Sequence, residues 1–317
     1  MNIPLVSVIC TCYNHREYIQ EALDSVVRQD YPSVELVIID NGSWDDSARH
    51  IESWAERSAG RIAVTTIIRA SPINYCRSFN QALALISGKY VIDLSGDDAL
   101  LSSHIRSAVE KLEANPSHLY FSNAFLETAG KRRATFYRVN SHGQASVGVD
   151  SGYIYQQVVA RTPICAPTLV FPTAILRAER GYDEDLAYED FDIIVRLARK
   201  YPFLYNDQIG VKKRVLSSSF SAQQYRVRNS KMLPSTLKVC HKIRHMNYTE
   251  QENQALMARI MYETKHALAS ANFDVALGFL DLATEIGVHT WHINLYRWWA
   301  KAKLDLSALY ILYQKIK

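Results

Sequence analysis

The sequence predicts an α/β fold, with a mostly parallel sheet covered by helices on both faces, followed by a helical C-terminal region. Apolar, β-rich runs alternate with helical stripes four times within about 115 residues, which is typical of parallel strands joined by crossover helices. The pattern becomes wholly helical after residue 230. We therefore expect two domains, residues 1–230 and 231–317, the first divided into halves 1–116 and 117–230.

The first half is predicted from four apolar runs that each precede a helical stripe. Each run is nearly continuous in Val, Ile and Leu, as buried parallel strands are, and each stripe repeats apolar residues at the helical period. Asn41-Gly42 ends the second strand and Gly88 ends the third helix. The expected strands are 5–13, 34–40, 61–68 and 89–94, and the expected helices are 15–29, 43–58, 73–87 and 100–116.

The remainder is less regular until the C-terminal helices begin. Apolar runs predict strands over 119–128 and 164–171, and the polar segment 131–152 between them predicts a loop or an exposed hairpin. A helix is expected over 189–201, then one or two strands over 203–216. Beyond Met232 the helical segments are 252–269, 273–287, 292–304 and 307–316.

The composition is that of an ordinary globular protein. Of 317 residues, 48% are hydrophobic and 21% charged, and the formal net charge is +4. No block of Lys and Arg is present, which argues against nucleic-acid binding. Five scattered cysteines favour reduced thiols, the N-terminus lacks the features of a signal peptide, and no apolar run approaches the ~18 residues of a membrane span. We therefore expect a cytoplasmic protein.

Polar side chains follow three of the predicted parallel strands. Thr11 and Tyr13 end the first strand, Asp40 ends the second, and the segment 95–98 follows the fourth. In open α/β sheets ligands bind beyond the carboxyl ends of the strands. The sequence thus predicts a ligand site at this edge.

The segment DLSGDDAL places carboxylates where a buried strand ends. Asp97 and Asp98 follow Gly96, which allows a tight turn, and a hard cation with oxygen ligands could hold a diphosphate there. The alternative is that Asp98 or Ser102 only caps the next helix. This segment alone leaves both interpretations open.

A second acidic group opens the helix expected at 189–201. Glu189, Asp190 and Asp192 occupy its first turn, where the helix dipole favours carboxylates. The functional alternative is that one of these carboxylates faces a cleft as a general base.

Four segments resemble family 2 glycosyltransferases of the GT-A type. They are the stretch from Val6 to Ser47, GKYVIDLSGDD, GYDEDLAYEDFDIIVRL and QYRVRNS. They occur in the family's order between Val6 and about Asn229. The resemblance implies a Rossmann-like GT-A fold and inverting transfer of a sugar from a nucleotide sugar, with UDP favoured, to a saccharide or lipid-linked saccharide. It also implies a role in bacterial surface polysaccharide or glycolipid synthesis.

The resemblance also implies roles for individual residues. Tyr13 would stack on the base and Asp40 would accept a hydrogen bond from a uracil-type imide. The complete set of implied nucleotide-binding residues is Thr11, Tyr13, Asp40, Asn41, Asn80, Ser95, Arg226 and Arg228.

The implied chemistry rests on carboxylates. Asp190 would be the catalytic base, with Glu189 on the acceptor side. Asp97, with Asp98, would hold a divalent cation, Mg²⁺ or Mn²⁺. This assignment requires Asp97 and Asp190 to converge on one pocket.

The chain departs from the family pattern at three positions. Asn41 and Ser95 stand where the family has aspartates, and Arg228 stands where it often has histidine. The loss of acids favours a non-catalytic nucleotide-binding or assembly protein as the alternative function, or a metal-independent mode helped by Arg. A nucleotidyltransferase would need a glycine-rich basic loop after the first strand, which CTCYNHREY lacks. Asn80 has the plainer alternative of a residue on a helix surface.

The C-terminal helices allow two interpretations. They pack together or onto the catalytic domain, or they form a peripheral contact with the inner face of the membrane. From Ile286 onward the sequence contains four lysines and one arginine but only one acidic residue, Asp305, and aromatic residues are interleaved with the basic ones. The aromatic residues that would contact lipid are Trp291, Trp298, Trp299, Tyr310 and Tyr313.

Overall fold

The computed structural model forms two compact units. The residues it describes are 3–128, 132–142, 144–145, 149–161, 163–216, 220–287 and 290–316. Unit 1 comprises Met1–Ile154, Pro163–Asp185 and Arg196–Leu216, and unit 2 comprises Tyr155–Thr162, Leu186–Val195 and Ser217–Lys317. This division differs from a single boundary at residue 230, because two earlier segments join the C-terminal helices.

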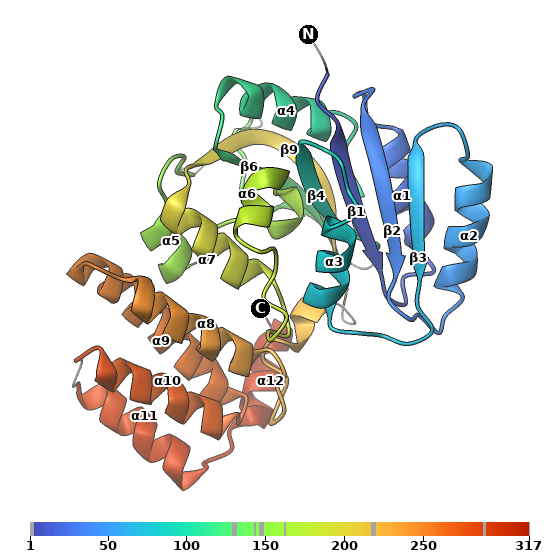
Figure 1. Cartoon of the computed structure of the whole chain (residues 1–317). Coiled ribbons are helices and arrows are strands. Elements are labelled where there is room, and N and C mark those ends of the chain that lie inside the picture. The colour runs from blue at the N-terminus through green and yellow to red at the C-terminus, as the bar shows by residue number, and fades with distance from the viewer. Residues whose placement is uncertain are drawn as a thin grey trace. The chain divides into compact units, whose positions relative to one another are not determined.

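Unit 1 contains the predicted parallel sheet (Figure 1). Three neighbouring pairs of its strands run parallel, and only the short last strand is antiparallel. In spatial order the strands are β3 (Ala63–Ile68), β2 (Val34–Asp40), β1 (Val6–Cys12), β4 (Tyr90–Ser95) and β8 (Phe171–Pro172). The α/β fold class and the four predicted strands of the first half are confirmed.

Helices cover both faces of this sheet. Every side chain of β1 is buried. Alternate β1 residues, from Val6 to Cys12, pack in one core with α1, α2 and α4, as expected of a strand with period-two side chains. The helices of unit 1 with their bounds are α1 (Ile19–Val27), α2 (Ser47–Arg57), α3 (Tyr75–Leu83), α4 (His104–Ala114), the 3₁₀ helix η1 (Ala166–Thr168) and α6 (Thr173–Ala178).

A second, smaller sheet completes unit 1. Its order is β5 (Ala99–Leu100), β9 (Phe203–Val215), β6 (Leu119–Thr128) and β7 (Arg132–Thr135). The predicted strand region 203–216 is thus one long strand, parallel to β6. The polar segment 131–152 does supply a hairpin strand, because β7 pairs antiparallel with β6.

Unit 2 consists of helices. Helix α7 (Asp190–Lys200) begins in unit 2 and continues into unit 1. The other helices of unit 2 are α5 (Tyr155–Ala160), the 3₁₀ helix η2 (Phe220–Gln223), α8 (Leu233–Met246), α9 (Glu250–Ala269), α10 (Phe273–Glu285), α11 (Trp291–Ala302) and α12 (Ser307–Ile316). Helix α9 begins with a capping box, in which Thr249 and Glu252 bond reciprocally.

Sequence analysis missed α8 as a separate helix. Its buried residues include Thr236, Val239, Cys240 and Ile243, a helical spacing that could have identified it. Among the described residues, no helix is both long and apolar enough to cross a membrane.

The structure modifies the predicted aromatic surface at the C-terminus. Trp291 and Trp298 are 67% and 61% exposed, but Tyr310 is only 8% exposed. The hydroxyl of Tyr310 bonds to His266 at 2.8 Å, and the indole of Trp299 donates to the carbonyl of Leu304 at 2.6 Å. The side chain of Tyr313 lies outside the described residues. Of the aromatic residues in this set whose side chains are described, Trp291 and Trp298 are the exposed ones.

Candidate functional site

The predicted ligand site lies at the carboxyl edge of the first sheet. The register pairs Thr11 with Ser95 and Cys12 with Asp40. Strands β1, β2 and β4 therefore end level with one another. The polar residues that follow these strands are brought to one edge of unit 1, as predicted.

Three buried polar atoms at this edge have no hydrogen-bond partner among the described residues. They are Oγ1 of Thr11, Oδ1 of Asp40 and Nδ1 of His15. The other oxygen of Asp40 accepts from the amide of Ser43 at 3.0 Å. Buried polar groups are normally paired, so unpaired atoms mark places where a ligand could supply a partner. Asp40 is fully buried, so a ligand reaches Oδ1 only if covering residues move.

His15 is a site residue that sequence analysis missed. Burial lowers its pKa below the ordinary value, against the opposing charges of Asp97 and Asp45. A Cβ atom on Gly96 would lie 3.0 Å from its Nδ1, so the ring lies beside the turn that carries the acidic pair. Its position two residues after Tyr13, beyond the end of the first strand, is the sequence signal that could have identified it as a site residue.

The two loops that follow β1 and β2 are joined by hydrogen bonds. The amide of Asn14 donates to Oγ of Ser43 at 2.8 Å, and the amide of Trp44 donates to Oδ1 of Asn14 at 2.9 Å. Tyr13 is 44% exposed and Trp44 is 81% exposed. The linked loops thus carry two exposed aromatic rings, of which only Tyr13 was predicted as a stacking residue.

Asn41 has a structural partner that explains its departure from the family pattern. Its Nδ2 donates to the carbonyl of Ile73 at 2.9 Å, and its Oδ1 accepts from the amide of Ile73 at 3.3 Å. An ionised aspartate can accept but cannot donate. The amide therefore holds the segment after β3 against the end of β2, and its nucleotide-binding role stays a prediction.

The acidic pair lies in a tight turn after β4. The amide of Gly96 donates to the carbonyl of Thr11 at 2.8 Å, and that of Asp98 donates to the carbonyl of Ser95 at 3.0 Å. The Ser95 hydroxyl donates to Oδ1 of Asp97. Asp97 and Asp98 are 7% and 3% exposed. Ser95, which replaces an aspartate of the family pattern, thus orients the carboxylate of Asp97.

Asp98 is directed toward the second sheet. Its Oδ1 accepts from the amide of Arg214 on β9 at 2.8 Å. Burial, and then the charge of Asp97, raise the pKa of Asp98 to about 7. The described residues contain no group of three His, Cys, Asp or Glu side chains that could hold a metal. Two adjacent carboxylates, one of them with a raised pKa, fit a cation, and other oxygen ligands such as phosphate would have to complete its coordination.

A buried arginine, Arg214, holds the acidic turn that follows β4 in place. Nη1 of Arg214 donates to the carbonyl of Asp97 at 2.5 Å, its Nη2 pairs with Glu21 on α1, and its guanidinium lies 4.8 Å from the centre of the Tyr18 ring. Its side chain is only 5% exposed. Arg214 therefore ties the acidic turn to α1, a role that its position in the sequence did not reveal.

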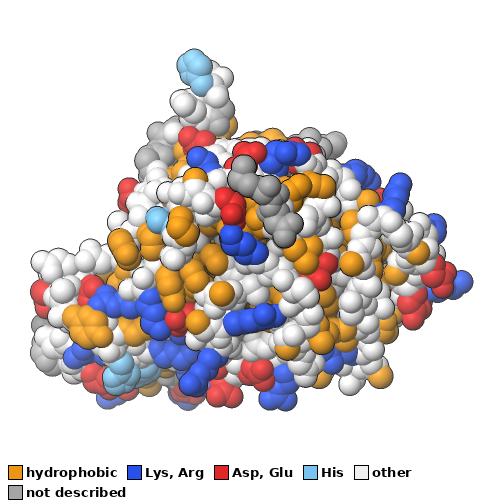
Figure 2. Space-filling model, turned by 45° about the horizontal axis from the view of Figure 1, so that its top comes forward, with side chains coloured by type: hydrophobic (Ala, Val, Ile, Leu, Met, Phe, Trp, Pro, Cys, Tyr) orange, Lys and Arg blue, Asp and Glu red, His pale blue; other side chains and the backbone are white. Residues whose placement is uncertain are grey.

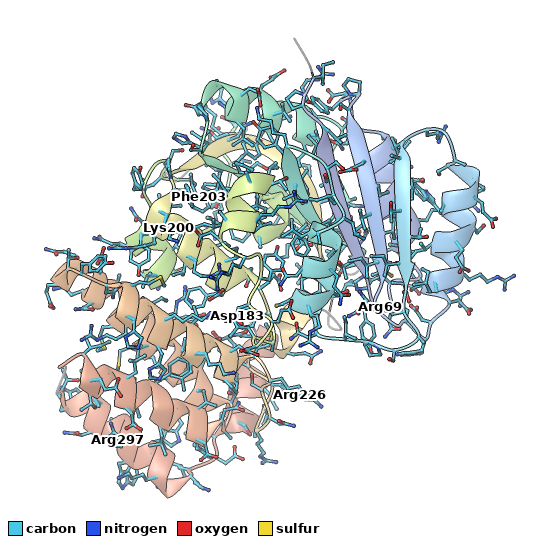
Figure 3. All side chains as sticks on the ribbon, in the orientation of Figure 1. Arg69, Asp183, Lys200, Phe203, Arg226 and Arg297 are labelled. Carbon is cyan, nitrogen blue, oxygen red and sulfur yellow. The ribbon has the colours of Figure 1, made fainter. Side chains whose placement is uncertain are left out.

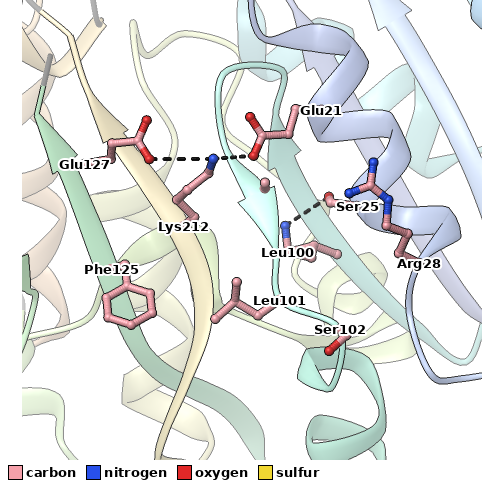
Figure 4. Close-up of a pocket in the computed structure, with 10 residues that line it drawn as sticks. Glu21, Ser25, Arg28, Leu100, Leu101, Ser102, Phe125, Glu127 and Lys212 are labelled. Atoms are coloured by element: carbon pink, nitrogen blue, oxygen red, sulfur yellow. Dashed lines mark hydrogen bonds and ion pairs between the residues drawn. The ribbon is translucent and has the colours of Figure 1, made fainter. Parts of the chain in front are cut away.

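Lys212 extends this ion-pair network on the same strand. It pairs with Glu21, and with Glu127 of β6 at 3.6 Å (Figure 4). Although burial alone would raise the pKa of Glu21, Lys212 and Arg214 lower it. A cavity of about 300 Å³ lies beside these residues, and Leu100 in its wall donates to Oγ of Ser25 at 3.0 Å. The network holds β5, β9 and α1 together directly after the acidic pair.

Asn80 is hydrogen-bonded within unit 1. Its Nδ2 donates to the carbonyl of Tyr182 at 2.8 Å and its Oδ1 accepts from the amide of Tyr182 at 2.9 Å. The hydroxyls of Tyr182 and Tyr75 donate to Asp93 at 2.7 Å. Asn80 therefore stabilises the fold by bonding to the backbone of Tyr182. Its role in binding the nucleotide-sugar donor stays a prediction. Asp93 is a carboxylate that accepts hydrogen bonds from two tyrosines.

Asp190 lines a cavity that is built wholly from unit 2. Its Oδ1 accepts from the amide of Phe191 at 2.7 Å, as at a helix start. The cavity has a volume of about 360 Å³. Asp192 pairs instead with Lys242 at 2.6 Å, and Glu189 is half-buried. Asp97 and Asp190 belong to different units, so their convergence stays a prediction.

The two late arginines differ in their contacts. Nε and Nη2 of Arg228 both donate to Oδ2 of Asp305, at 2.9 and 2.7 Å. Arg226 is exposed on the loop before α8 (Figure 3). Arg228 is thus engaged within unit 2, and diphosphate binding by either residue stays a prediction. On the face in Figure 2, basic and acidic side chains are interspersed, consistent with the net charge of +4.

Sequence comparison identifies the family of the N-terminal part. Residues 7–149 match the model of Glycosyl transferase family 2. An uncharacterized glycosyltransferase of Haemophilus influenzae is 34% identical over 40% of this chain and 38% of its own length. The UDP-Glc:alpha-D-GlcNAc-diphosphoundecaprenol beta-1,3-glucosyltransferase WfaP of Escherichia coli is 28% identical over 39% of this chain and 47% of its own. The chain thus spans less than half of these curated relatives.

Solved structures share the fold over nearly the whole chain. S. aureus TarS 1-349 in complex with UDP-GlcNAc has a TM-score of 0.70 at 15% identity, covering 99% of this chain and 92% of that one. Mannosyltransferase PcManGT from Pyrobaculum calidifontis, in complex with GDP-Man and Mn²⁺, has a TM-score of 0.59 at 18% identity, covering 99% and 89%. Residues 7–149 therefore resemble family 2 glycosyltransferases, and the chain shares the GT-A fold of these solved structures.

Proposed function

We propose that the chain is an inverting glycosyltransferase that moves a sugar from a nucleotide sugar to a hydroxyl of a saccharide or lipid-linked saccharide. The supporting observation is the sheet edge at which Thr11, Asp40 and the acidic turn meet, with unpaired buried polar atoms. The E. coli relative acts on a lipid-linked acceptor according to its name. A role in bacterial surface polysaccharide or glycolipid synthesis follows.

The donor is a UDP-sugar in this proposal. The unpaired Oδ1 of Asp40 can accept the imide N–H of uracil, and the exposed ring of Tyr13 can stack on the base. Two of the compared proteins carry UDP-sugars in their names. A nucleotide base without an N–H at that edge would leave the acceptor unpaired and bind less well.

The reaction is an in-line displacement at the anomeric carbon. The acceptor hydroxyl attacks from the face opposite the nucleotide, and its oxygen forms the new glycosidic bond as the bond to the diphosphate breaks. Asp190 accepts the hydroxyl proton in that step. One displacement inverts the anomeric configuration, and the electron pair of the broken bond leaves with the nucleoside diphosphate.

A divalent cation, Mg²⁺ or Mn²⁺, would be held by Asp97 and would neutralise charge on the departing diphosphate. Ser95 keeps the Asp97 carboxylate oriented, and Arg214 fixes the carbonyl of the same residue. The compared mannosyltransferase was solved with Mn²⁺. Calorimetry of UDP binding with and without Mn²⁺ tests this role: Asp97→Asn should remove the difference, and identical wild-type isotherms would argue against a cation.

The decisive experiment concerns Asp190. Asp190→Asn should retain UDP affinity and lose transfer by ~10²–10⁴-fold, the usual loss for a general base. The matched control is Asp185→Asn, an exposed aspartate outside the cavity, which should retain both. Transfer at the wild-type rate in Asp190→Asn rejects the assignment.

The alternative is a nucleotide-binding protein without catalysis. It was favoured by Asn41 and Ser95, but both have structural partners in the fold. Hydrolysis of a nucleotide-sugar panel separates the two functions, because slow donor hydrolysis needs no acceptor. Binding of UDP without hydrolysis of any donor would favour the alternative.

We also propose a peripheral membrane contact through α11. Trp291, Leu295 and Trp298 are spaced on one helical face and are 67%, 46% and 61% exposed. Lys301 is exposed on the same helix and would attract anionic lipid, whereas Arg297 (Figure 3) pairs with Asp281. Flotation with phosphatidylglycerol vesicles should carry the wild type, and Trp291→Ala with Trp298→Ala should abolish it. Equal flotation of both proteins would dismiss the contact.

A further inference from the structure

We propose that a groove between α1 and α2 of unit 1 is a separate anion-binding site, which takes a ligand with two linked phosphate groups. The groove has a volume of about 390 Å³. None of its lining residues belongs to the predicted donor site, so the proposal does not depend on the proposed function. The lining residues that carry the argument are Arg16, Gln20, Asp46, Arg49, Ser53 and Arg57.

One wall of the groove is a basic face of α2. Arg49, Ser53 and Arg57 are spaced by four residues along this helix, so their side chains share one face. Ile51 and Trp54, on the other side of α2, are buried in the core that α1 also enters. The core therefore holds both helices in place and leaves the basic face directed to solvent.

The backbone of the opposite wall is held to the start of α2 by hydrogen bonds. The amide of Arg16 donates to Oδ2 of Asp45 at 3.0 Å, and the amide of His15 donates to Oγ of Ser47 at 3.1 Å. The backbone positions of Arg16 and of α2 are therefore fixed relative to each other before a ligand binds.

Positive charge exceeds negative charge in the groove. Three guanidiniums and one carboxylate line it, which leaves a net charge of +2. The carboxylate is that of Asp46, whose Oδ2 lies 3.6 Å from Nη1 of Arg16, with side chains 67% and 57% exposed. An ion pair this exposed contributes little to stability, so it can open for a ligand. The two acids within α2, Glu52 and Glu56, do not line the groove.

The arginines of α2 are not neutralised within the described ranges of the chain. There the guanidinium of Arg49 has neither an ion-pair nor a hydrogen-bond partner. Nη1 of Arg57 donates to Oγ of Ser53 at 2.6 Å, which is a neutral partner. Both arginines are exposed. Each guanidinium presents a planar fork of N–H donors that matches two phosphate oxygens, so both are available to a phosphate ligand.

The spacing of these arginines favours two linked phosphates over a single one. Arg49 and Arg57 are eight residues apart, which corresponds to about 12 Å along the helix axis. Two linked phosphates can each meet one guanidinium, and the second contact is then intramolecular and costs less entropy. The Ser53 hydroxyl between the arginines and the Gln20 amide on α1 add neutral donors.

The test is calorimetry of the full chain with pyrophosphate in EDTA. The wild type should bind pyrophosphate about tenfold more tightly than inorganic phosphate. Arg49→Ala with Arg57→Ala should weaken pyrophosphate binding at least about tenfold, because charge-assisted bonds are lost. The charge-matched control is Arg61→Ala with Lys111→Ala, both exposed and outside the groove, and it should bind like the wild type.

A gain of affinity provides a second test that a misfolded variant could not imitate. Asp46→Asn removes the opposing carboxylate and should tighten pyrophosphate binding severalfold. Asparagine tolerates the left-handed backbone that Asp46 adopts at φ +66°, so the fold should be retained. Unchanged or weaker binding in Asp46→Asn overturns the proposal.

Flotation with phosphatidylcholine vesicles that contain cardiolipin distinguishes a lipid headgroup from a soluble ligand. The protein for this arm carries Trp291→Ala and Trp298→Ala, so that these tryptophans do not contribute. Flotation that is lost on adding Arg49→Ala and Arg57→Ala supports the site with a lipid headgroup as ligand. Pyrophosphate binding without flotation supports it with a soluble ligand.

Three results would overturn the inference. The first is a wild type that binds neither pyrophosphate nor these vesicles. The second is pyrophosphate binding of equal strength in the wild type and in Arg49→Ala with Arg57→Ala, which would place the anion elsewhere. The third is equal affinity for phosphate and pyrophosphate, which would exclude a ligand with linked phosphates. None of these results bears on sugar transfer, so the proposed function is tested separately.

Discussion

His104, the first residue of α4, makes the fold sensitive to acid. It is fully buried, and neither ring nitrogen has a hydrogen-bond partner among the described residues. Its ring lies 5.9 Å from that of Tyr120, and a Cβ on Gly210 would fall 2.1 Å from its Nδ1. Burial lowers the pKa of His104 from 6.5 to about 4. The folded protein therefore holds this imidazole neutral where the unfolded chain would protonate it.

The sign and size of the effect follow from that difference. The folded pKa is depressed, so the unfolded state binds the extra proton between pH 6.5 and 4, and stability falls as the pH drops through that window. A difference of about 2.5 pKa units corresponds to about 3 kcal/mol. His104→Leu removes the titration and two unpaired buried nitrogens, so we expect it to be more stable than wild type, increasingly so toward pH 4.

Urea unfolding at pH 7.5, 6 and 4.5 measures the free energy of unfolding for both proteins. The advantage of His104→Leu should grow by roughly 2–3 kcal/mol between the first and last pH. The matched control is His50→Leu, which removes an exposed histidine of α2 and should leave the pH dependence unchanged. Parallel curves for wild type and His104→Leu would refute the reasoning.

Two other substitutions test contacts that hold the ligand edge. Gly42→Ala should lower the free energy of unfolding by more than ~2 kcal/mol, because Gly42 has φ +80° and an added Cβ would lie 2.4 Å from the nitrogen of Pro72. Gly60→Ala, with φ +84° and open space, should lose only about 1 kcal/mol in the same thermal melts, and equal losses would contradict the clash. Arg214→Met should lower the free energy of unfolding by ~1–3 kcal/mol in urea unfolding, because the carbonyl of Asp97 in the buried turn loses the hydrogen bond from the guanidinium. Lys212→Met should lose clearly less, and the reverse order would count against Arg214 as the residue that fixes the acidic turn.

Sequence patterns predicted the parallel sheet because each of its strands and helices can be identified from residues that are close together in the sequence. The apolar runs of β1, β2 and β4 are buried by helices that their own loops connect, whereas β3 lies at the edge of the sheet and is largely exposed. Thr11 and Asp40 lie at the ends of β1 and β2, and Asp97 follows β4, so their common edge could be predicted from topology alone.

The partners of these residues could not be predicted in the same way. The bond between Arg214 and Asp98 joins residues 116 apart, and the bonds of Asn80 with Tyr182 span 102. Nothing in the local pattern distinguishes Arg214 from its basic neighbours on β9. Asn41 was a departure in the sequence and became a two-way hydrogen bond to Ile73 only once the chain was folded.

The sequence by itself determined the alternation of strands and helices in the first half, the acidic turn and the family resemblance, because periodicity and turn residues act over a few positions, whereas the order of the strands in the sheet came from the structure. Only the tertiary structure decided that Asp98 faces Arg214 and that Asp190 borders a cavity walled by α9. Burial and pairing depend on which distant segments meet. Ion pairs and cavities form between segments that are distant in the sequence, so they cannot be predicted from a local sequence pattern.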